Sequence, residues 1–338
     1  PTGIQSSIGS MKAAVPRQRL ACLLGCSVAL QGGCSTEPTV TTNDASGQTD
    51  AGDAGSTALD VDRAEDRFVP ARFFFDPEGI HQVRIDLPPQ KWAALLANAK
   101  NPSLDRLWHE AAVIFDGDTW KKVALRNFGE GSQEANPGKP NVRLKFNLYD
   151  PASDGPSKLN NIRLKAAGED PSFLREPMAY DALRAMGAKA PRYSWAQVNI
   201  NGEHYGLYQI IEQVDSKFFK FHFGDKTGIN YDIASSCGGF NCPNSDCAAL
   251  EKKYALKSEK GGFGHILAIA SAAADTKLSD AAFTKTLEAH ADVDALLAVY
   301  AIELFGADPD GLMRAAQNLE LYVDPKTDRL HVIRSGMD

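Results

Sequence analysis

The 338-residue sequence predicts an α+β protein in which a strand-rich half with one embedded helix precedes a helical half. From about Arg67 to Val214, runs that alternate apolar and polar residues dominate, as in half-buried strands. From Leu250 onward, apolar residues mostly recur every three or four positions, which is the spacing of amphipathic helices. The length, together with a hydrophobic content of 43%, allows one large domain or two lobes with a real core.

The strand-rich half contains five alternating segments, within residues 80–88, 111–132, 139–149, 157–166 and 194–214. Asp116-Gly117 and Asn201-Gly202 favour tight hairpin turns, because these residue types tolerate the left-handed backbone that such turns require. The segments that contain them therefore each predict two strands.

Helical spacing predicts a helix after Pro88-Pro89 and the embedded helix within residues 170–192. Asp170-Pro171-Ser172 favours the start of the embedded helix, and Gly187 favours its end. Pro177 predicts either a kink or the start of the main helix, because proline is disfavoured in helix interiors. In the second half, helices are expected within residues 265–276, 279–290 and 292–306, before two strands around Asp324-Pro325.

An export signal is predicted within residues 11–34. Met11 is the expected start, and a basic stretch leads into an apolar run that is too short to span a membrane. Small residues then precede Cys34, as in a bacterial lipoprotein cleavage box, so Cys34 is the candidate for lipidation. Cys26 fits the box better but would leave an apolar run of only about six residues, below the usual ~7–15. A plain signal peptide without a lipid is the alternative.

Residues 35–66 are interpreted as an acidic linker. Eight of these residues are acidic and one, Arg63, is basic, so the segment carries a net charge of −7, equal to that of the whole chain. Small and polar residues dominate, and the lack of apolar surface predicts a disordered tether. The folded domain is therefore expected to comprise residues 67–338, without the basic field that nucleic-acid binding requires.

Three cysteines follow the predicted signal, namely Cys237, Cys242 and Cys247. In an exported protein they predict one disulfide and one odd thiol. A zinc site is the alternative, although the equal spacing and the lack of a nearby histidine are not typical of one.

Phosphate-binding groups are predicted in the strand-rich half. A turn with Gly129, Gly131 and Ser132 can present backbone N–H groups to phosphate oxygens, although most such glycines only form turns. The next strand places cations on one face, which would hold phosphates if a carboxylate fixed one of them and would otherwise be a solvated surface. These cations are Lys139, Arg143 and Lys145. Glu176 is the candidate partner, and a carboxylate that only stabilises a helix start is the alternative.

The end of the chain carries a second set of candidate groups. Phosphoryl transfer needs a carboxylate that orients the acceptor, together with oxygen ligands for a divalent metal. Asp310, Asn318 and Asp338 supply these groups in order, although loop acids are more often solvated.

The order of these groups, from glycine-rich turn to final aspartate, is that of a two-lobed kinase. The residues resemble the CotH (spore coat protein H) family of atypical secreted protein kinases over about 73–338. The most specific segments are "DPSFLRE", "NGEHYGLYQIIEQVD" and "DVDALLAVYAIELFGADPDGLMRAAQN". The resemblance implies a two-lobed protein-kinase-like fold, with a strand-rich N-lobe and a helical C-lobe.

The resemblance also implies ATP, Mg²⁺ or Mn²⁺, and transfer of phosphate to Ser or Thr of extracytoplasmic proteins from a domain anchored at the bacterial surface. By position, Asp310 is similar to the catalytic aspartate, and Asn318 and Asp338 to metal ligands. Residues 212–214, with Glu212 and Val214, are similar to the hinge that meets adenine. Lys139, Arg143 or Lys145 would hold phosphates, with Glu176 as the possible partner.

Two features depart from the family pattern. Gly336 replaces an acidic residue of the closing motif, and the sequence stops at Asp338, so a C-terminally incomplete domain is expected. A non-catalytic, kinase-shaped surface adhesin or assembly module is therefore the alternative function. A scaffold held together by its three cysteines is a third interpretation.

Overall fold

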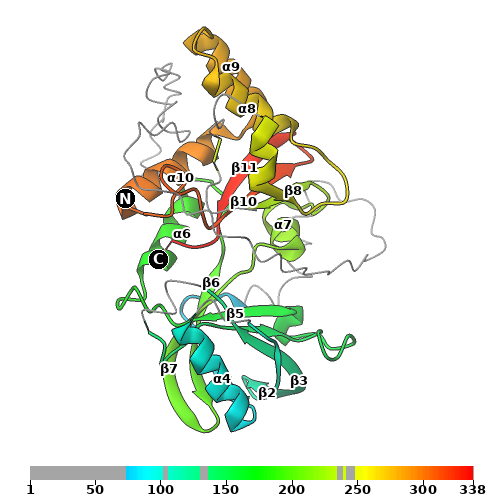
Figure 1. The fold of residues 1–338 in the computed structure, drawn as a ribbon, viewed down its shortest axis with the longest axis vertical. Helices are drawn as coiled ribbons and strands as arrows, with labels where there is room; N and C mark the ends of the chain where they lie inside the picture. The colour runs from blue at the N-terminus through cyan, green and yellow to red at the C-terminus, as the bar shows by residue number, and fades with distance from the viewer. Residues whose placement is uncertain (1–73, 102–105, 130–135, 234–238, 241–247, 338) are drawn as a thin grey trace, which may run out of the picture. The chain divides into compact units, whose positions relative to one another are not determined.

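The computed structural model describes residues 74–101, 106–129, 136–233, 239–240 and 248–337 (Figure 1). They form two compact units. The barrel unit comprises the described residues up to Thr227 together with residues 334–337, and the sheet unit comprises Gly228–Ile333. The predicted signal peptide (11–34) and acidic linker (35–66) lie outside the described residues.

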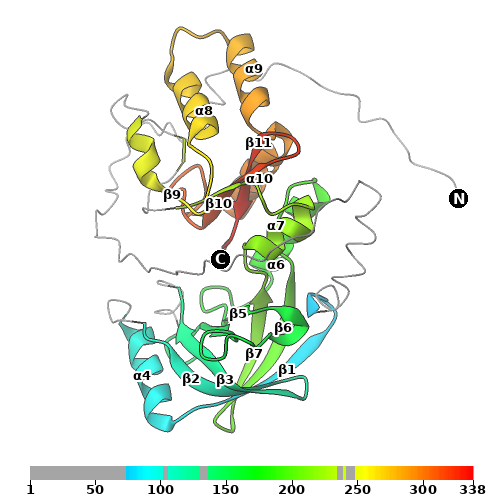
Figure 2. The same cartoon turned by 90° about the vertical axis from the view of Figure 1, so that its right-hand side faces the viewer.

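The barrel unit is built on seven strands that close in the order β1-β2-β3-β4-β5-β7-β6 (Figure 2). They are β1 (Ile80–Asp86), β2 (His109–Phe115), β3 (Asp118–Asn127), β4 (Val142–Lys145), β5 (Asn161–Lys165), β6 (Tyr193–Ile200) and β7 (Glu203–Ile211). β1 pairs in parallel with β6, and the other neighbours pair antiparallel. This parallel pair joins the first strand to the sixth and so closes the barrel.

Alternation along each strand separates an inner apolar face from an outer polar face. In β4 and β5, Val142, Leu144, Ile162 and Leu164 are fully buried in the barrel core. The residues between them are only partly buried and point to the outside. The predicted alternating segments are therefore confirmed as strands, and the direction of each side chain follows from its position in the alternation.

Both predicted hairpin turns are confirmed. Asp116 and Gly117 connect β2 to β3 with φ angles of 49° and 97°, and Asn201 and Gly202 connect β6 to β7 with 52° and 85°. Asn201 also accepts a hydrogen bond from the backbone of Leu87, which follows β1. Two positive φ angles in succession are typical of type I′ turns, whose backbone twist matches that of the flanking strands.

Three helices belong to the barrel unit: α4 (Pro89–Lys100), α6 (Arg175–Ala185) and α7 (Ser216–Phe223). α6 begins at Arg175, five residues after Asp170, whose carboxylate instead binds the backbone of Ser172 and Arg175. Pro177 lies in the first turn of α6, where a missing backbone donor costs nothing. α7 was not predicted, and Asp215 caps it by accepting from the backbone N–H of Lys217 and Phe218.

The sheet unit contains a four-stranded sheet in the order β11-β10-β8-β9. Its strands are β8 (Ile229–Ile233), β9 (Tyr254–Leu256), β10 (Leu319–Asp324) and β11 (Arg329–Arg334). Three helices accompany them, namely α8 (Gly264–Ala274), α9 (Asp280–His290) and α10 (Val293–Gly306). α8 and α9 lie side by side as a helical hairpin (Figure 2). The predicted helices and the final pair of strands are confirmed.

The predicted two-lobed kinase-like fold is wrong. The first half is a closed seven-stranded barrel with three helices, not an N-lobe with one embedded helix. The second half is not simply helical, because a four-stranded sheet runs through it. Closure of the barrel depends on the pairing of Val83 with Val198, more than one hundred residues apart in the chain. Local alternation carries no signal for such a contact.

Among the described residues, none of the helices has the length and apolar character needed to cross a bilayer.

Candidate functional site

A buried ion pair joins β5 to α6 on the outside of the barrel. Lys165 Nζ donates to Glu176 Oε2 over 2.6 Å, and only 10% and 2% of these side chains are exposed. Tyr180, one helical turn after Glu176, donates its hydroxyl to Glu176 Oε1, also over 2.6 Å. Both oxygens of the carboxylate are thus engaged, and the lysine ammonium is held in one place.

The neighbouring backbone holds both partners of this pair. Lys165 is the last residue of β5 and pairs with Gln209 of β7. The Gln209 side chain donates to the carbonyl of Phe173, just before α6, over 2.7 Å. Glu176 itself lies in the first turn of α6, where the helix dipole favours a negative charge. The two elements that carry the pair are therefore tied to the same strand.

The sequence pattern predicts Glu176 as the partner of a cation but does not single out Lys165. The pattern instead predicts three other cations. The first, Lys139, donates to the carbonyl of Leu207 over 2.6 Å and lies against the ring of Tyr208. Burial lowers the pKa of Lys139. Arg143 and Lys145 point to the outside of β4. A usable signal existed, because Lys165 ends an alternating run directly before the loop that leads to α6.

Of the predicted glycine-rich turn, only its first residue is described. Gly129 follows β3 with a φ angle of 85°, a conformation that favours glycine. Gly131 and Ser132 lie outside the described residues, so a phosphate-binding role of this turn stays a prediction.

Glu212, predicted as part of an adenine-binding hinge, is buried directly after β7. Its carboxylate accepts from Arg192 through Oε1 at 2.6 Å and from His222 through Oε2 at 3.0 Å. Burial alone would raise the pKa of Glu212, but the hydrogen bond and charge of His222 and those of Arg192 outweigh it and lower the pKa to about 2. The carboxylate of Glu212 thus has a structural role within the barrel unit, where it binds Arg192 and His222.

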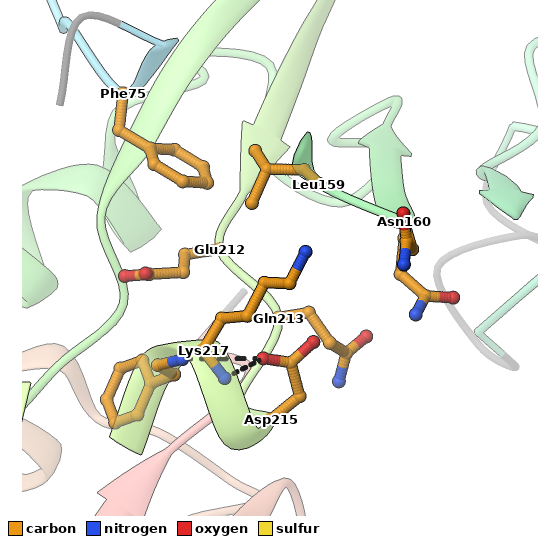
Figure 3. Close-up of a pocket in the computed structure, with 9 residues that line it drawn as sticks. Phe75, Leu159, Asn160, Glu212, Gln213, Asp215 and Lys217 are labelled. Carbon is orange, nitrogen blue, oxygen red and sulfur yellow. Dashed lines mark hydrogen bonds between the residues drawn. The ribbon is translucent and has the colours of Figure 1, made fainter. Parts of the chain in front are cut away.

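A small pocket opens beside Glu212 (Figure 3). It is lined by Phe75, Leu159, Asn160, Asn161, Glu212, Gln213, Asp215, Lys217 and Phe218. The amide oxygens of Asn160 and Gln213 are buried and have no hydrogen-bond partner among the described residues. Three of the lining residues, Phe75, Leu159 and Phe218, are apolar, and the other six are polar or charged. Val214, the other predicted hinge residue, is buried and does not line this pocket.

In the sheet unit, the structure brings Asp310 and Asn318 together. Asn318 Nδ2 donates to Asp310 Oδ2 over 3.3 Å, across the turns between α10 and β10. The amide nitrogen of Asn318 is thereby hydrogen-bonded to Asp310, so its amide oxygen is the atom with which this side chain would bind a cation. Gly311, next to Asp310, lies close to Glu303, because an added Cβ would be 2.8 Å from the carboxylate of Glu303, which would have to shift.

One carboxylate and one amide oxygen are hard ligands of the kind that Mg²⁺ prefers, and Mg²⁺ usually keeps several waters besides. Within the described part of the chain, no group of three or more His, Cys, Asp or Glu side chains is placed to hold a metal ion. Asp338, the third predicted group, lies outside the described residues, as do Cys34, Cys237, Cys242 and Cys247.

Residues 126–334 match the model of the family described as CotH kinase protein, which covers more than half of the chain. The chain belongs to this CotH kinase protein family. The matched region contains the two pairs that the structure brings together, Lys165 with Glu176 and Asp310 with Asn318. The resemblance of the sequence to this family is therefore confirmed.

Two curated CotH relatives come from the fungus Rhizopus delemar. Invasin CotH3 is 23% identical over 273 residues, and Invasin CotH2 is 24% identical over 268 residues. These matches cover 78% and 77% of this chain but only 42% of each relative. The chain thus spans less than half the length of the curated relatives, and a bacterial origin stays a prediction.

Proposed function

We propose that the protein is an ATP-dependent phosphotransferase whose barrel unit holds the nucleotide through Lys165. The observation that carries the proposal is the buried pair between Lys165 and Glu176. A buried ion pair contributes little to stability, because the cost of desolvating both charges offsets most of their attraction. In phosphotransferases, a lysine fixed by a helix glutamate places one positive charge on the phosphates of the nucleotide.

The pocket beside Glu212 supports the same proposal. The buried amide oxygens of Asn160 and Gln213 would accept hydrogen bonds from the exocyclic amine of adenine, with Phe75 and Leu159 beside the ring. The hinge predicted at residues 212–214 then corresponds to a pocket wall in which Gln213, rather than the carboxylate of Glu212, contacts the base.

In the sheet unit, Asp310 would orient the Ser or Thr hydroxyl that accepts the phosphoryl group. Asn318, with Asp338, would hold Mg²⁺ or Mn²⁺, and the ion would neutralise phosphate charge when bound. The hydrogen bond between Asn318 and Asp310 sets the direction of both side chains before the substrate binds. Such positioning is the main contribution that a protein makes to phosphoryl transfer.

The experiment is a nucleotide-binding assay on the 338-residue chain, followed by transfer of the labelled terminal phosphate of ATP. A nucleotide at 100 times its dissociation constant should stabilise the protein by about 2.7 kcal/mol. We expect the melting temperature to rise with ATP plus Mg²⁺, and the effect to be lost in Lys165→Met/Glu176→Gln. Lys122→Met, at an exposed position of β3, is the matched control and should keep the shift.

Asp310→Asn is expected to bind nucleotide and to lose transfer of the label, since the orienting carboxylate is absent. If the unmodified protein melts cooperatively and neither ATP nor another nucleoside triphosphate shifts its melting temperature, the phosphotransferase proposal is wrong.

A second candidate function is that of a non-catalytic surface adhesin or assembly module. The observation that favours it is the name of the two relatives, both of which are invasins. It predicts that the protein binds a surface partner equally well in its native form and as Lys165→Met/Glu176→Gln or Asp310→Asn, without nucleotide.

Both candidates place the protein outside the cytoplasm, and we propose export and lipid anchoring through Cys34. Expression of the full chain with labelled fatty acid should give a labelled protein, and Cys34→Ala should not be labelled. Equal labelling of Cys34→Ala would show that the lipid is attached to another residue.

A further inference from the structure

Two histidines and an aspartate of the sheet unit lie in contact with one another. His265 Nδ1 lies 3.2 Å from His290 Nδ1, and His265 Nε2 lies 3.2 Å from Asp328 Oδ1. His265 is the second residue of α8, His290 is the last residue of α9, and Asp328 belongs to the turn between β10 and β11. We call these three residues the histidine cluster.

Local structure holds each residue of the cluster in place. α8 and α9 pack against each other as a hairpin, which brings the start of one helix to the end of the other. Directly after His290, Ala291 forms a parallel bridge with Leu330, and this bridge ties the end of α9 to β11. The backbone N–H of Asp328 donates to the carbonyl of Asp324 over 2.9 Å. The cluster is therefore preformed by contacts that lie outside it.

The contact with Asp328 determines which nitrogen of His265 carries a proton. A carboxylate only accepts, so neutral His265 has its proton on Nε2 and a lone pair on Nδ1, toward His290. A carboxylate in this position is a common partner of a metal-binding imidazole, since it fixes the ring and raises its basicity. Burial and the nearby His265 lower the pKa of His290, which favours the neutral form that a metal ion requires.

The distance between the two Nδ1 atoms fits two ligands of one metal ion. Zinc–nitrogen bonds measure about 2.0–2.1 Å, so two imidazole nitrogens on a tetrahedral zinc ion lie roughly 3.4 Å apart. The observed separation of 3.2 Å is close to this value. A direct hydrogen bond between the rings has a similar length, but it requires His290 to carry its proton on Nδ1. The two interpretations therefore differ in the tautomer of His290.

We propose that His265 and His290 bind a divalent transition-metal ion such as Zn²⁺ through their Nδ1 atoms, with Asp328 as the carboxylate that orients His265. Within the described residues, no third His, Cys, Asp or Glu side chain is placed to hold the ion with them, so water completes its coordination. Asp328 is 85% exposed, which leaves the cluster open to solvent on that side.

This site differs in its chemistry from the pair proposed for Mg²⁺. Imidazole nitrogens suit Zn²⁺, whereas the carboxylate and amide oxygens of Asp310 and Asn318 suit Mg²⁺. The proposal for the histidine cluster is therefore independent of the proposed function.

The test is a titration of the 338-residue chain with Zn²⁺, followed by NMR of the ring nitrogens of histidine. Without Zn²⁺, His290 should carry its proton on Nδ1, where it donates to His265. Zn²⁺ should shift the Nδ1 signals of both rings and move the proton of His290 to Nε2. Because the signals belong to individual residues, Zn²⁺ at the cluster is distinguished from Zn²⁺ bound by cysteines.

Single variants measure the contribution of each side chain to Zn²⁺ affinity, which is followed on the remaining ring signals. His265→Gln and His290→Gln should each weaken binding at least about tenfold, because each removes one of two protein ligands. Asp328→Asn should weaken it by no more than about tenfold, since its exposed carboxylate acts through His265. His204→Gln removes an exposed histidine of β7 and is the matched control, which should leave the affinity unchanged.

The melting temperature of each variant without metal shows whether the sheet unit is intact, and the titration of the native protein decides even if a variant does not fold. If Zn²⁺ leaves the ring signals of His265 and His290 unchanged in the native protein, the rings form only a hydrogen bond and the proposal is wrong. Equal Zn²⁺ affinity of His290→Gln and the native protein would also overturn it. Neither result affects the proposed function, which is tested separately by ATP binding.

Discussion

The carboxylate of Glu212 lies within hydrogen-bond distance of two side chains from separate parts of the barrel unit, Arg192 and His222. Arg192 precedes β6 and also stacks on the ring of Phe221, 3.7 Å from its centre. His222 belongs to α7. One buried carboxylate thus ties the end of β7 to the segment before β6 and to a helix that sequence patterns did not predict.

The first prediction concerns acid stability. The pKa of Glu212 is about 2 in the fold, against 4.5 for an ordinary glutamate. Its contribution to stability is therefore fully present above pH 4.5 and is lost as the pH falls through about 2. Glu212→Gln should lower the free energy of unfolding at pH 7 by about 3 kcal/mol. Urea titrations between pH 7 and pH 2 should show a flatter pH dependence for the variant. If the unfolding free energies of the native protein and the variant change with pH in parallel, the pKa of Glu212 is not lowered in the fold.

The second prediction concerns His222, whose pKa is lowered because burial disfavours its charged form. A histidine with a lowered pKa stabilises the fold above the unfolded value of about 6.5, and this contribution is lost as the pH falls below that value. An NMR titration should therefore show His222 neutral at pH 7, donating its Nε2 proton to Glu212. A titration midpoint above 6.5 would mean that the pair carries two charges instead.

The third prediction concerns the buried pair at the proposed phosphate site. Lys165→Met leaves the Glu176 carboxylate buried without its cation and should cost about 3–5 kcal/mol of stability. Lys165→Met/Glu176→Gln removes both charges and keeps an acceptor for the hydroxyl of Tyr180, so it should recover most of this loss. Urea unfolding at pH 7 measures both. If the loss of stability in the double variant equals the sum of the losses in the two single variants, the two side chains do not interact.

The fourth prediction concerns Tyr180, whose hydroxyl donates to Glu176. Tyr180→Phe removes a buried hydrogen bond to a charged group and should cost about 1.5–3 kcal/mol. It should also weaken ATP binding, because Glu176 is then held less firmly against Lys165. Tyr193→Phe is a matched control, since its hydroxyl donates to Asp181, away from the pair. Equal effects of both variants on ATP binding would contradict the positioning role of Tyr180.

The fifth prediction concerns the turn that carries Asp310. A Cβ atom at position 311 would meet the Glu303 carboxylate, so Gly311→Ala should cost about 1–3 kcal/mol through overpacking. The variant should also lose phosphate transfer, because the turn positions Asp310. Gly262→Ala is a matched control for the loss of a glycine, since nothing lies within 4 Å of its added Cβ and its φ angle is not positive. Unchanged stability of Gly311→Ala would show that Glu303 moves aside.

Much of the local structure could be predicted because its determinants are local. The two hairpin turns depend on Asp116-Gly117 and Asn201-Gly202, and the strands on alternation over five to ten residues. The short strands β8 and β9 and the eight-residue helix α7 were missed, because segments of this length carry too few repeats to show a period.

The candidate site was predicted in part. Asp310 and Asn318 were named from their order in the chain, and the structure brings them within hydrogen-bond distance. Glu176 was named without its partner, because several cations in the strand-rich half satisfied the same pattern. Only the register of β5 against β7, together with the first turn of α6, selects Lys165.

Composition, spacing and short motifs are enough to predict most of the elements, the family and the residue types that the proposed chemistry needs. The tertiary structure decided that the first half closes into a barrel, since closure rests on the pairing of β1 with β6 across most of that half. It also decided which side chains meet. His265 and His290 are 25 residues apart in the chain, and only the packing of α8 against α9 brings their rings together.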